Sequence, residues 1–320
     1  MKLQILITQY KETEDVIRPL LTSIATQQGV DLEKEIEVII GNDGSDVKLS
    51  EGFLGSFPYP IRYLQFEHVG LSWCRQELFD ASAAEYVMFC DADDMFYNMC
   101  GLWIIFREMD QGVFDSLVSV FVEETRNPAT KQPEYINRDM DSTFVHGKVH
   151  RRKYLQKKKI RWNPNLTIHE DSFFNIQCMS LSQNVKYCPH PFYLWKWRDD
   201  SVCRHDSKYI LKTYRNMIDS NSALIAEFKK KGHPDKAAFY TVFMIFDAYY
   251  TMNKPEWIDM DNQEYRKSTE MYFANYYRTH KKTWENFPYQ EKVNISQGIR
   301  GRSVQEGMHL EAMTVEEWLN

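Results

Sequence analysis

The chain has 320 residues, of which 43% are hydrophobic, enough for one large core and a second, smaller one. Its net charge is -6, so the molecule as a whole is not a generic binder of polyanions. No pair of its six cysteines has CxxC spacing, which argues against a structural zinc site. No stretch reaches the ~20 apolar residues that span a bilayer, and Gln9 and Lys11 interrupt the first apolar run. We therefore expect a soluble, cytoplasmic protein without a transmembrane segment.

The first 125 residues alternate short apolar runs with helical patterns. The apolar runs predict strands at Leu3–Thr8, Ile36–Gly41, Ile61–Phe66, Tyr86–Cys90 and Ser116–Val122. Apolar residues at helical spacing predict helices over Thr13–Gln27 and near 70–84 and 98–110. This alternation is typical of a parallel sheet that helices cover on both faces.

Polar side chains follow three of these predicted strands. Thr8 and Gln9 follow the first strand, residues 42–45 (NDGS) the second, and residues 91–94 (DADD) the fourth. In open α/β sheets, ligands bind outside the carboxyl ends of the strands. The simpler interpretation is that polar residues merely begin loops, which accounts for one such group better than for three.

Beyond about residue 126 the pattern changes. Residues 127–135 predict a loop, 146–162 a basic and partly helical segment, and 163–200 a mixture of loop and helix. From about residue 206, helical patterns continue almost to the last residue. We therefore expect two parts, residues 1–205 and residues 206–320.

Asp91 and Asp93 flank a single small residue after a predicted buried strand. Crowded carboxylates repel each other and raise their pKa values, and a divalent cation relieves this conflict. Mg²⁺ and Mn²⁺ favour carboxylate oxygens and leave positions open for phosphates, so the pair would suit a reaction with a diphosphate leaving group. The alternative is a solvated acidic turn or a helix cap by Asp94. The apolar strand before the pair favours the metal site.

A second acidic motif, His169-Glu170-Asp171, precedes an apolar helical pattern. A carboxylate at the start of that helix, across a cleft from a metal, would suit a general base that takes a proton from a hydroxyl. The alternative is that Glu170 and Asp171 only complement the helix dipole.

Together these motifs resemble those of the family 2 glycosyltransferases with the GT-A fold. The resemblance covers roughly residues 3–205 and is carried by residues 5–12 (ILITQYKE), 39–46 (IIGNDGSD), 68–94, 146–162 and 168–174 (IHEDSFF). It implies a Rossmann-like mixed sheet flanked by helices, with residues 206–320 as a helical extension. The chain also resembles members encoded by bacteriophages, which implies the host cytoplasm as its location.

The resemblance implies a role for each matched residue. The implied nucleotide-binding residues are Thr8, Tyr10, Asp43, Arg75 and Asp91, with Asp43 accepting a hydrogen bond from the base. Asp93 matches the ligand of a Mn²⁺ or Mg²⁺ ion, which Asp91 also contacts. Asp171 matches the catalytic base, and the adjacent Glu170 is the other expected catalytic residue. Asn42 replaces a commoner Asp, which leaves its role open.

An aromatic and basic segment with Trp195, Trp197 and Arg198 follows. Arg198 or His205 is expected to reach the donor diphosphate, and His205 to complete the metal shell. The tryptophans either pack in the core or stack on an acceptor sugar.

The sequence thus predicts an inverting, metal-dependent glycosyltransferase that uses a nucleotide-sugar donor, a UDP-sugar by resemblance, with Asp171 as general base. A non-catalytic carbohydrate- or nucleic-acid-binding protein on the same fold is the alternative, and the presence of both Asp93 and Asp171 argues against it. A nucleotidyltransferase would need a glycine-rich loop after the first strand, which is absent.

The acceptor is open between a glycan, a phosphate-bearing cell-wall polymer and hydroxymethylated DNA. A polyanionic acceptor is the hypothesis that a basic cluster raises: Arg151, Arg152, Lys153, Lys157, Lys158, Lys159 and Arg161. We expect this cluster to border the acceptor side of the cleft. The simpler interpretation is a solvated helix face.

Overall fold

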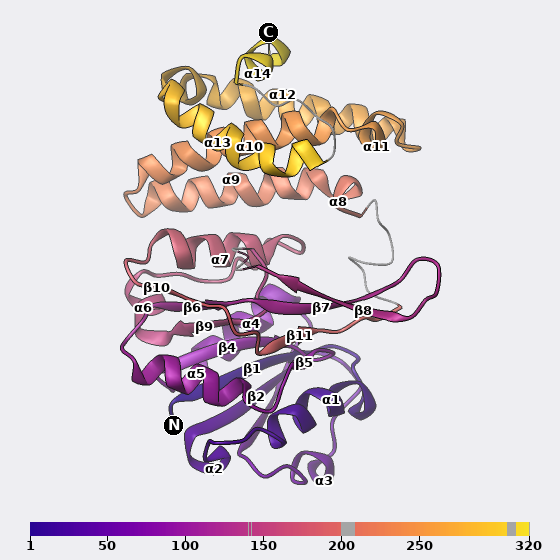
Figure 1. The fold of residues 1–320 in the computed structure, drawn as a ribbon, viewed down its shortest axis with the longest axis vertical. Helices are drawn as coiled ribbons and strands as arrows, with labels where there is room; N and C mark the ends of the chain where they lie inside the picture. The colour runs from indigo at the N-terminus through magenta and orange to yellow at the C-terminus, as the bar shows by residue number, and fades with distance from the viewer. Residues whose placement is uncertain (140, 142, 200–208, 306–311, 320) are drawn as a thin grey trace. The chain divides into compact units, whose positions relative to one another are not determined.

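The computed structural model describes residues 1–139, 141, 143–199, 209–305 and 312–319 (Figure 1). The chain forms two compact units, Met1–Asp199 and Asp200–Asn320. The boundary expected between residues 205 and 206 falls among residues that the structure does not describe.

A mixed sheet of seven strands forms the centre of the first unit, in the order β10-β6-β9-β4-β1-β2-β3 (Figure 1). The strands are β1 (Leu3–Gln9), β2 (Ile36–Asp43), β3 (Ile61–Phe66), β4 (Tyr86–Asp91), β6 (Ser116–Ser119), β9 (Lys148–Arg151) and β10 (Val185–Cys188). The strands from β3 to β4 are parallel, whereas β9 runs antiparallel to both β4 and β6. This confirms the expected mixed sheet of a GT-A fold.

Helices cover both faces of the sheet, because its central strands are apolar on both sides. The longer helices of this unit are α1 (Glu14–Ala25), α4 (Leu71–Asp80), α5 (Gly101–Asp110) and α7 (Glu170–Ser180), with α2 (Leu32–Glu35), α3 (Glu51–Leu54) and α6 (Arg152–Lys157) shorter. The apolar face of α1 packs with Ile36, Val38 and Ile40 of β2. On the opposite face, Gly41 lets α4 approach closely, since a Cβ there would lie 3.0 Å from Cys74 Sγ.

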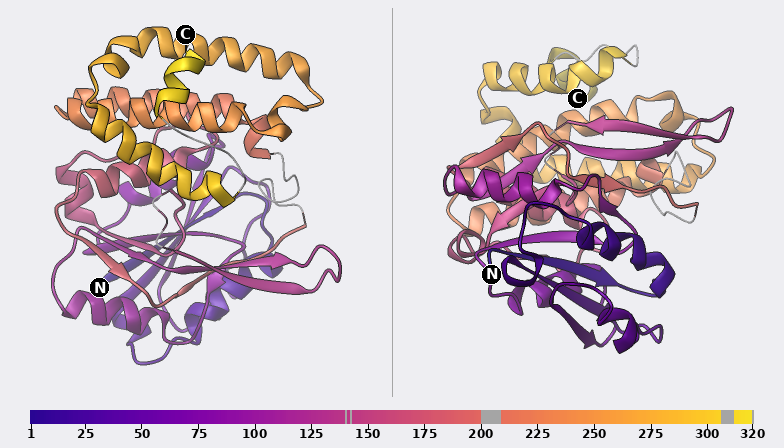
Figure 2. Two further views of the ribbon diagram at one scale, coloured as in Figure 1. Left: turned by 45° about the horizontal axis from the view of Figure 1, so that its top comes forward. Right: turned by 60° about the horizontal axis from the view of Figure 1, so that its bottom comes forward.

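A second, four-stranded sheet has the order β5-β11-β7-β8. Its strands are β5 (Met95–Phe96), β7 (Phe121–Arg126), β8 (Pro133–Arg138) and β11 (Tyr193–Trp195). The β7–β8 hairpin extends beyond the rest of this sheet in both views of Figure 2.

Two predictions about residues 116–135 were wrong. The strand expected over Ser116–Val122 is interrupted at Val120, and its two parts, β6 and β7, belong to different sheets. The loop expected over 127–135 ends at residue 132, and β8 begins at Pro133. All six residues of β8 are exposed, so the strand has none of the apolar alternation that reveals a half-buried one.

The second unit is helical, as expected. Its helices are α8 (Tyr209–Lys212), α9 (Tyr214–Lys230), α10 (Pro234–Met252), α11 (Pro255–Ile258), α12 (Gln263–Asn286), α13 (Tyr289–Gln305) and α14 (Ala312–Leu319). Helix α10 is central, because buried residues occupy most of its circumference and it contacts α9, α12 and α13. None of the described helices combines the length and the hydrophobicity that crossing a bilayer requires.

Candidate active site

The carboxyl ends of β1, β2 and β4 lie side by side, as the polar residues after these strands predicted. Thr8 of β1 stands opposite Gly41 of β2 on one side and Asp91 of β4 on the other. The loops that follow the three strands therefore share one edge of the sheet. The sequence motifs at 8–12, 42–46 and 91–94 meet there.

Tyr10 presents a ring at this edge. The Tyr10 ring stacks on the His68 imidazole, with ring centroids 4.4 Å apart and planes 12° from parallel. The residue remains 39% exposed. A partly exposed ring supported from behind by a second ring is suited to stacking on a planar group such as a nucleobase.

Asp43 is buried and anchors the chain before α4. Its carboxylate accepts hydrogen bonds from the backbone N–H groups of Val69 (3.0 Å) and Gly70 (3.1 Å) and contacts His68 Nδ1 at 3.0 Å. The Gly70 N–H also lies 3.2 Å from the other carboxylate oxygen, so these donors occupy most of the about four acceptor positions of the carboxylate. Most of the carboxylate therefore holds the loop, and the expected bond from a nucleobase to Asp43 stays a prediction.

Asn42 has a role that the sequence left open. It is fully buried, and its amide oxygen accepts from the N–H of Ser45 (2.7 Å) while its amide nitrogen donates to Ser45 O (3.1 Å) and to the Tyr63 hydroxyl (2.9 Å). Only an amide supplies both the acceptor and the donors. Asn42 therefore shapes the loop that carries Asp43.

Arg75 joins the two acidic motifs. Its guanidinium donates to Asp91 Oδ1 (2.7 Å), Glu170 Oε1 (3.2 Å) and Asp171 Oδ1 (2.5 Å). The side chain is 3% exposed, and its guanidinium carbon lies 4.8 Å from the centroid of the Trp162 ring. The structure thus encloses Arg75 among carboxylates. Its implied contact with the base and phosphates stays a prediction.

The two acids at the start of α7 differ in environment. Burial raises the pKa of Glu170 to about 8, and the neighbouring Asp171 adds to the rise. Asp171 is the more exposed side chain, 19% against 11%, and its second oxygen accepts from the N–H of Val145 at 3.3 Å. His169, before them, adopts a left-handed conformation with φ 61°. Asp171 is thus better placed than Glu170 to meet a substrate.

Several carboxylates lie close together in and around the loop after β4. Burial raises the pKa of Asp93, of Asp94 and of Glu12 in the loop after β1, and neighbouring carboxylates raise each further. Asp91 is only partly buried, and Arg75 outweighs the effect of that burial and holds the pKa of Asp91 below its usual value. Such a cluster is suited to a divalent cation.

Arg198 lies at the same cluster. Its Nη1 is 3.1 Å from Asp93 Oδ2 and 3.9 Å from Glu12 Oε1. The structure therefore brings Arg198 to the acidic loop, as its expected role near a diphosphate requires. His205 lies outside the described residues.

His146 is a site residue that sequence reasoning missed. Its imidazole is buried, and its Nδ1 lies 3.7 Å from Asp94 Oδ2 without a hydrogen-bond partner among the described residues. Ligand atoms of Asp91, Asp94 and His146 all lie within 4.8 Å of one another. Burial lowers the pKa of His146 to about 4, so the imidazole is neutral and free of a proton on one nitrogen.

Aromatic rings enclose this histidine, at centroid distances of 4.9–5.5 Å: Phe121, Phe144, Tyr193 and Trp195. Behind the loop, Lys148 is 1% exposed and donates to the carbonyl of Phe144, and burial lowers its pKa to about 8. Asp94 accepts from the Tyr193 hydroxyl at 2.6 Å, and strand β5 rather than a helix follows it, so Asp94 is not the helix cap that was the alternative. These contacts fix His146 and Asp94 in place.

The basic cluster does not lie at this edge, so that expectation was wrong. Arg151, the last residue of β9, pairs with Tyr86, the first residue of β4, because the two strands are antiparallel. Helix α6 therefore begins at the amino end of β4, whereas Asp91 is at its carboxyl end. Figure 1 shows α6 and β5 on opposite sides of the first unit. Two members of the cluster pair with surface acids there, Arg151 with Glu85 and Arg161 with Asp80.

Comparisons with known proteins agree with this fold. The model of the family described as "Glycosyl transferase family 2" matches residues 4–183. A glycosyltransferase named GlyA, from Streptococcus pneumoniae serotype 4, is 23% identical over 257 residues, which are 73% of this chain and 35% of that protein. The chain thus spans about a third of that relative.

Two solved structures share the fold at low sequence identity. Residues 1–349 of TarS from S. aureus, in complex with UDP-GlcNAc, are 15% identical with a TM-score of 0.63, covering 86% of this chain and 81% of that one. The mannosyltransferase PcManGT from Pyrobaculum calidifontis, in complex with GDP-Man and Mn²⁺, is 12% identical with a TM-score of 0.52, covering 84% and 86%.

Proposed function

Since the chain belongs to glycosyl transferase family 2 and is a glycosyltransferase, we propose that it moves a sugar from a nucleotide-sugar donor to an acceptor hydroxyl, with inversion and with a divalent cation. The observation that carries this proposal is Arg75, which holds Asp91 of the donor-side motif and Asp171 of the second motif within 2.7 Å of one guanidinium. The buried Arg75 guanidinium thus holds the Asp91 motif and the Asp171 motif next to each other.

The donor is proposed to be a UDP-sugar. Its base would stack on Tyr10 and donate to Asp43, beside Thr8 at the end of β1. Similar folds carry UDP-GlcNAc in TarS and GDP-Man in PcManGT, so the fold accommodates both nucleotides. Arg198 would contribute positive charge near the diphosphate.

A divalent cation fits the acidic loop. Asp91 and Asp93 were the expected ligands, and the buried, unpartnered Nδ1 of His146 beside Asp91 and Asp94 offers a second set. Carboxylate oxygens together with a neutral imidazole suit Mn²⁺. When bound, the cation would neutralise charge that develops on the diphosphate leaving group. Arg198 adds positive charge beside Asp93, and Arg75 adds it beside Asp91.

Asp171 is proposed as the general base. Its bond to Arg75 holds the carboxylate in place, while its partial exposure lets an acceptor hydroxyl reach it. As the acceptor oxygen attacks the anomeric carbon, its proton passes to Asp171 and the bond to the diphosphate breaks on the opposite face. A single displacement of this kind inverts the anomeric configuration. Glu170 positions Arg75.

The acceptor is proposed to be a glycan hydroxyl. The polyanionic acceptors, hydroxymethylated DNA and a phosphate-bearing cell-wall polymer, rested on the basic cluster, and that cluster lies at the other edge of the sheet. No other observation favours them among the described residues.

The test is release of the nucleoside diphosphate. The full chain with Mn²⁺ is first screened against UDP- and GDP-sugars by thermal shift, and the donor that stabilises it is then assayed for hydrolysis. We expect donor breakdown that EDTA stops and Mn²⁺ restores, and Asp171→Asn should lower turnover by at least ~10²-fold without loss of donor binding. A folded protein that binds a donor but never breaks it down would support the non-catalytic alternative instead.

A further inference from the structure

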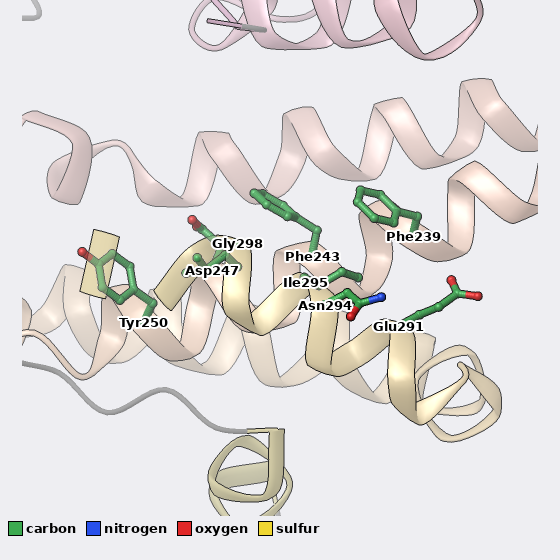
Figure 3. Close-up of a pocket in the computed structure, with 9 residues that line it drawn as sticks. Phe239, Phe243, Asp247, Tyr250, Glu291, Asn294, Ile295 and Gly298 are labelled. Atoms are coloured by element: carbon green, nitrogen blue, oxygen red, sulfur yellow. The ribbon is translucent and has the colours of Figure 1, made fainter. Parts of the chain in front are cut away.

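The second unit contains a pocket that the proposed reaction does not use. It has a volume of about 440 Å³ and lies between α10 and α13 (Figure 3). All the described residues that line it belong to these two helices. Its volume is in the range of small-molecule sites.

The α10 wall carries aromatic rings that the core does not cover. Phe239, Phe243 and Asp247 are each one helical turn apart, so they share a face of α10. Phe239 is 39% exposed and Phe243 is half-buried, whereas most apolar residues of α10 are fully buried. The C–H face of a sugar ring packs well on such exposed rings.

Polar groups in the pocket are mainly acceptors. Asp247 is held by the hydroxyl of the fully buried Tyr214, which donates to its Oδ2 at 2.8 Å. Glu291 and Asn294 on α13 add a carboxylate and an amide. No lysine or arginine is among the described residues that line the pocket. The two carboxylates would accept from hydroxyl groups and repel phosphates.

Gly298 lines the pocket and has no side chain that could fill it. It lies within α13, where glycine is unfavourable compared with alanine, and a Cβ built on it would meet no atom within 4 Å. A longer side chain there would enter the pocket. Figure 3 shows Tyr250 and Glu291 at opposite ends of the pocket, with Phe243 and Ile295 between them, so the pocket is elongated.

We propose that this pocket binds a short segment of neutral saccharide, with sugar rings on Phe239 and Phe243 and hydroxyl groups donating to Asp247 and Glu291. The choice of a neutral sugar follows from the lining of the pocket. That the saccharide is part of the acceptor glycan rests on the proposed function.

The experiment measures binding of cellotetraose, maltotetraose and chitotetraose to the full chain by saturation-transfer NMR. Gly298→Leu should fill the pocket while it raises helix propensity, so the variant is expected to fold. Gly52→Leu is the matched control, because Gly52 is another exposed helical glycine whose Cβ would meet nothing within 4 Å. At least one tetrasaccharide should bind the wild type and Gly52→Leu, and lose about tenfold or more in affinity with Gly298→Leu and with Phe243→Ala.

Three results would overturn the proposal: no binding of any tetrasaccharide to the wild type, equal binding to Gly298→Leu, or equal binding of poly(glycerol phosphate) at the same pocket. Donor hydrolysis is measured on the same variants. Donor hydrolysis needs only the candidate active site in Met1–Asp199, so Gly298→Leu should hydrolyse the donor as the wild type does. Absence of hydrolysis in the wild type would instead count against the proposed function and leave the binding result to stand by itself.

Discussion

Arg75 shows how single residues organise this site. A guanidinium presents several donors in a fixed plane, so one side chain can bind Asp91, Glu170 and Asp171 at once, which a lysine cannot do with the same geometry. Three carboxylates around one cation leave an excess of negative charge. One of them is therefore expected to hold its proton at neutral pH, and the buried Glu170 is the one whose pKa is raised to about 8.

This proton has a consequence for stability. Glu170 titrates near 4.5 when unfolded and near 8 when folded, so between these values the folded state binds more protons and stability falls as pH rises. Glu170→Gln cannot lose a proton. Its stability relative to the wild type should therefore improve steadily from about pH 4.5 to about pH 8. Urea unfolding at several pH values measures this difference, and a difference that is constant with pH would refute the assignment.

His146 makes a second prediction at the scale of a residue. If it is a ligand with Asp91 and Asp94, His146→Asn should weaken Mn²⁺ binding by about tenfold or more. His150→Asn is the matched control, because His150 is buried in the same segment but is hydrogen-bonded to Ser116 at 2.9 Å. Mn²⁺ binding is read by electron paramagnetic resonance, without any turnover. If His146→Asn binds Mn²⁺ as tightly as the wild type and Asp93→Ala binds it more weakly, His146 is not a ligand and Asp93 is, as first expected.

At the scale of the element, the approach of α4 to β2 depends on Gly41. A Cβ at this position would lie 2.9 Å from the Phe66 ring and 3.0 Å from Cys74 Sγ and Leu78 Cδ2. Gly41→Ala should therefore destabilise the protein by about 1–3 kcal/mol through overpacking. Gly52→Ala, at an open helical position, should not. Equal urea midpoints for the two variants would show that α4 shifts without cost.

Elements that are buried on both faces could be predicted from sequence, and exposed or reversed ones could not. β1, β2 and β4 were expected within a few residues of their ends, because their apolar runs leave no alternative to a covered sheet. β8 is exposed along its length and carries no apolar signal. The direction of β9 is fixed by its pairing with β4 and β6, and no local sequence pattern predicts it. Because β9 runs antiparallel to β4, the basic cluster that follows it lies at the opposite edge of the sheet from the candidate site.

Local sequence patterns likewise predict some residues of the candidate site and not others. Asp91, Asp93 and Asp171 stand at strand or helix ends, so their motifs were visible in the sequence. His146 follows no helix or strand end of that kind, and only the packing of four rings brings it beside Asp94. The enclosed position of Arg75 likewise appears only when α4 and α7 are placed together by the fold.

At the scale of the whole molecule, charge is arranged so that the basic residues of α6 and its flanks lie away from the acidic loop. Replacement of Lys157, Lys158 and Lys159 by Glu should therefore leave transfer unchanged, and activity of the wild type should vary little as salt rises. The triple variant is assayed with the donor that the wild type uses. A marked loss of transfer, together with steep salt dependence of the wild type, would restore the polyanionic acceptor.

A single displacement at the site that Arg75 and Asp171 form inverts the anomeric carbon of the sugar. The most direct measurement is NMR of the sugar that the enzyme releases or transfers from an α-linked nucleotide-sugar, recorded before the anomers equilibrate. The first product should be the β-anomer, and Asp171→Asn should not form it at a comparable rate. An α-product from the wild type would contradict inversion and, with it, the role given to Asp171.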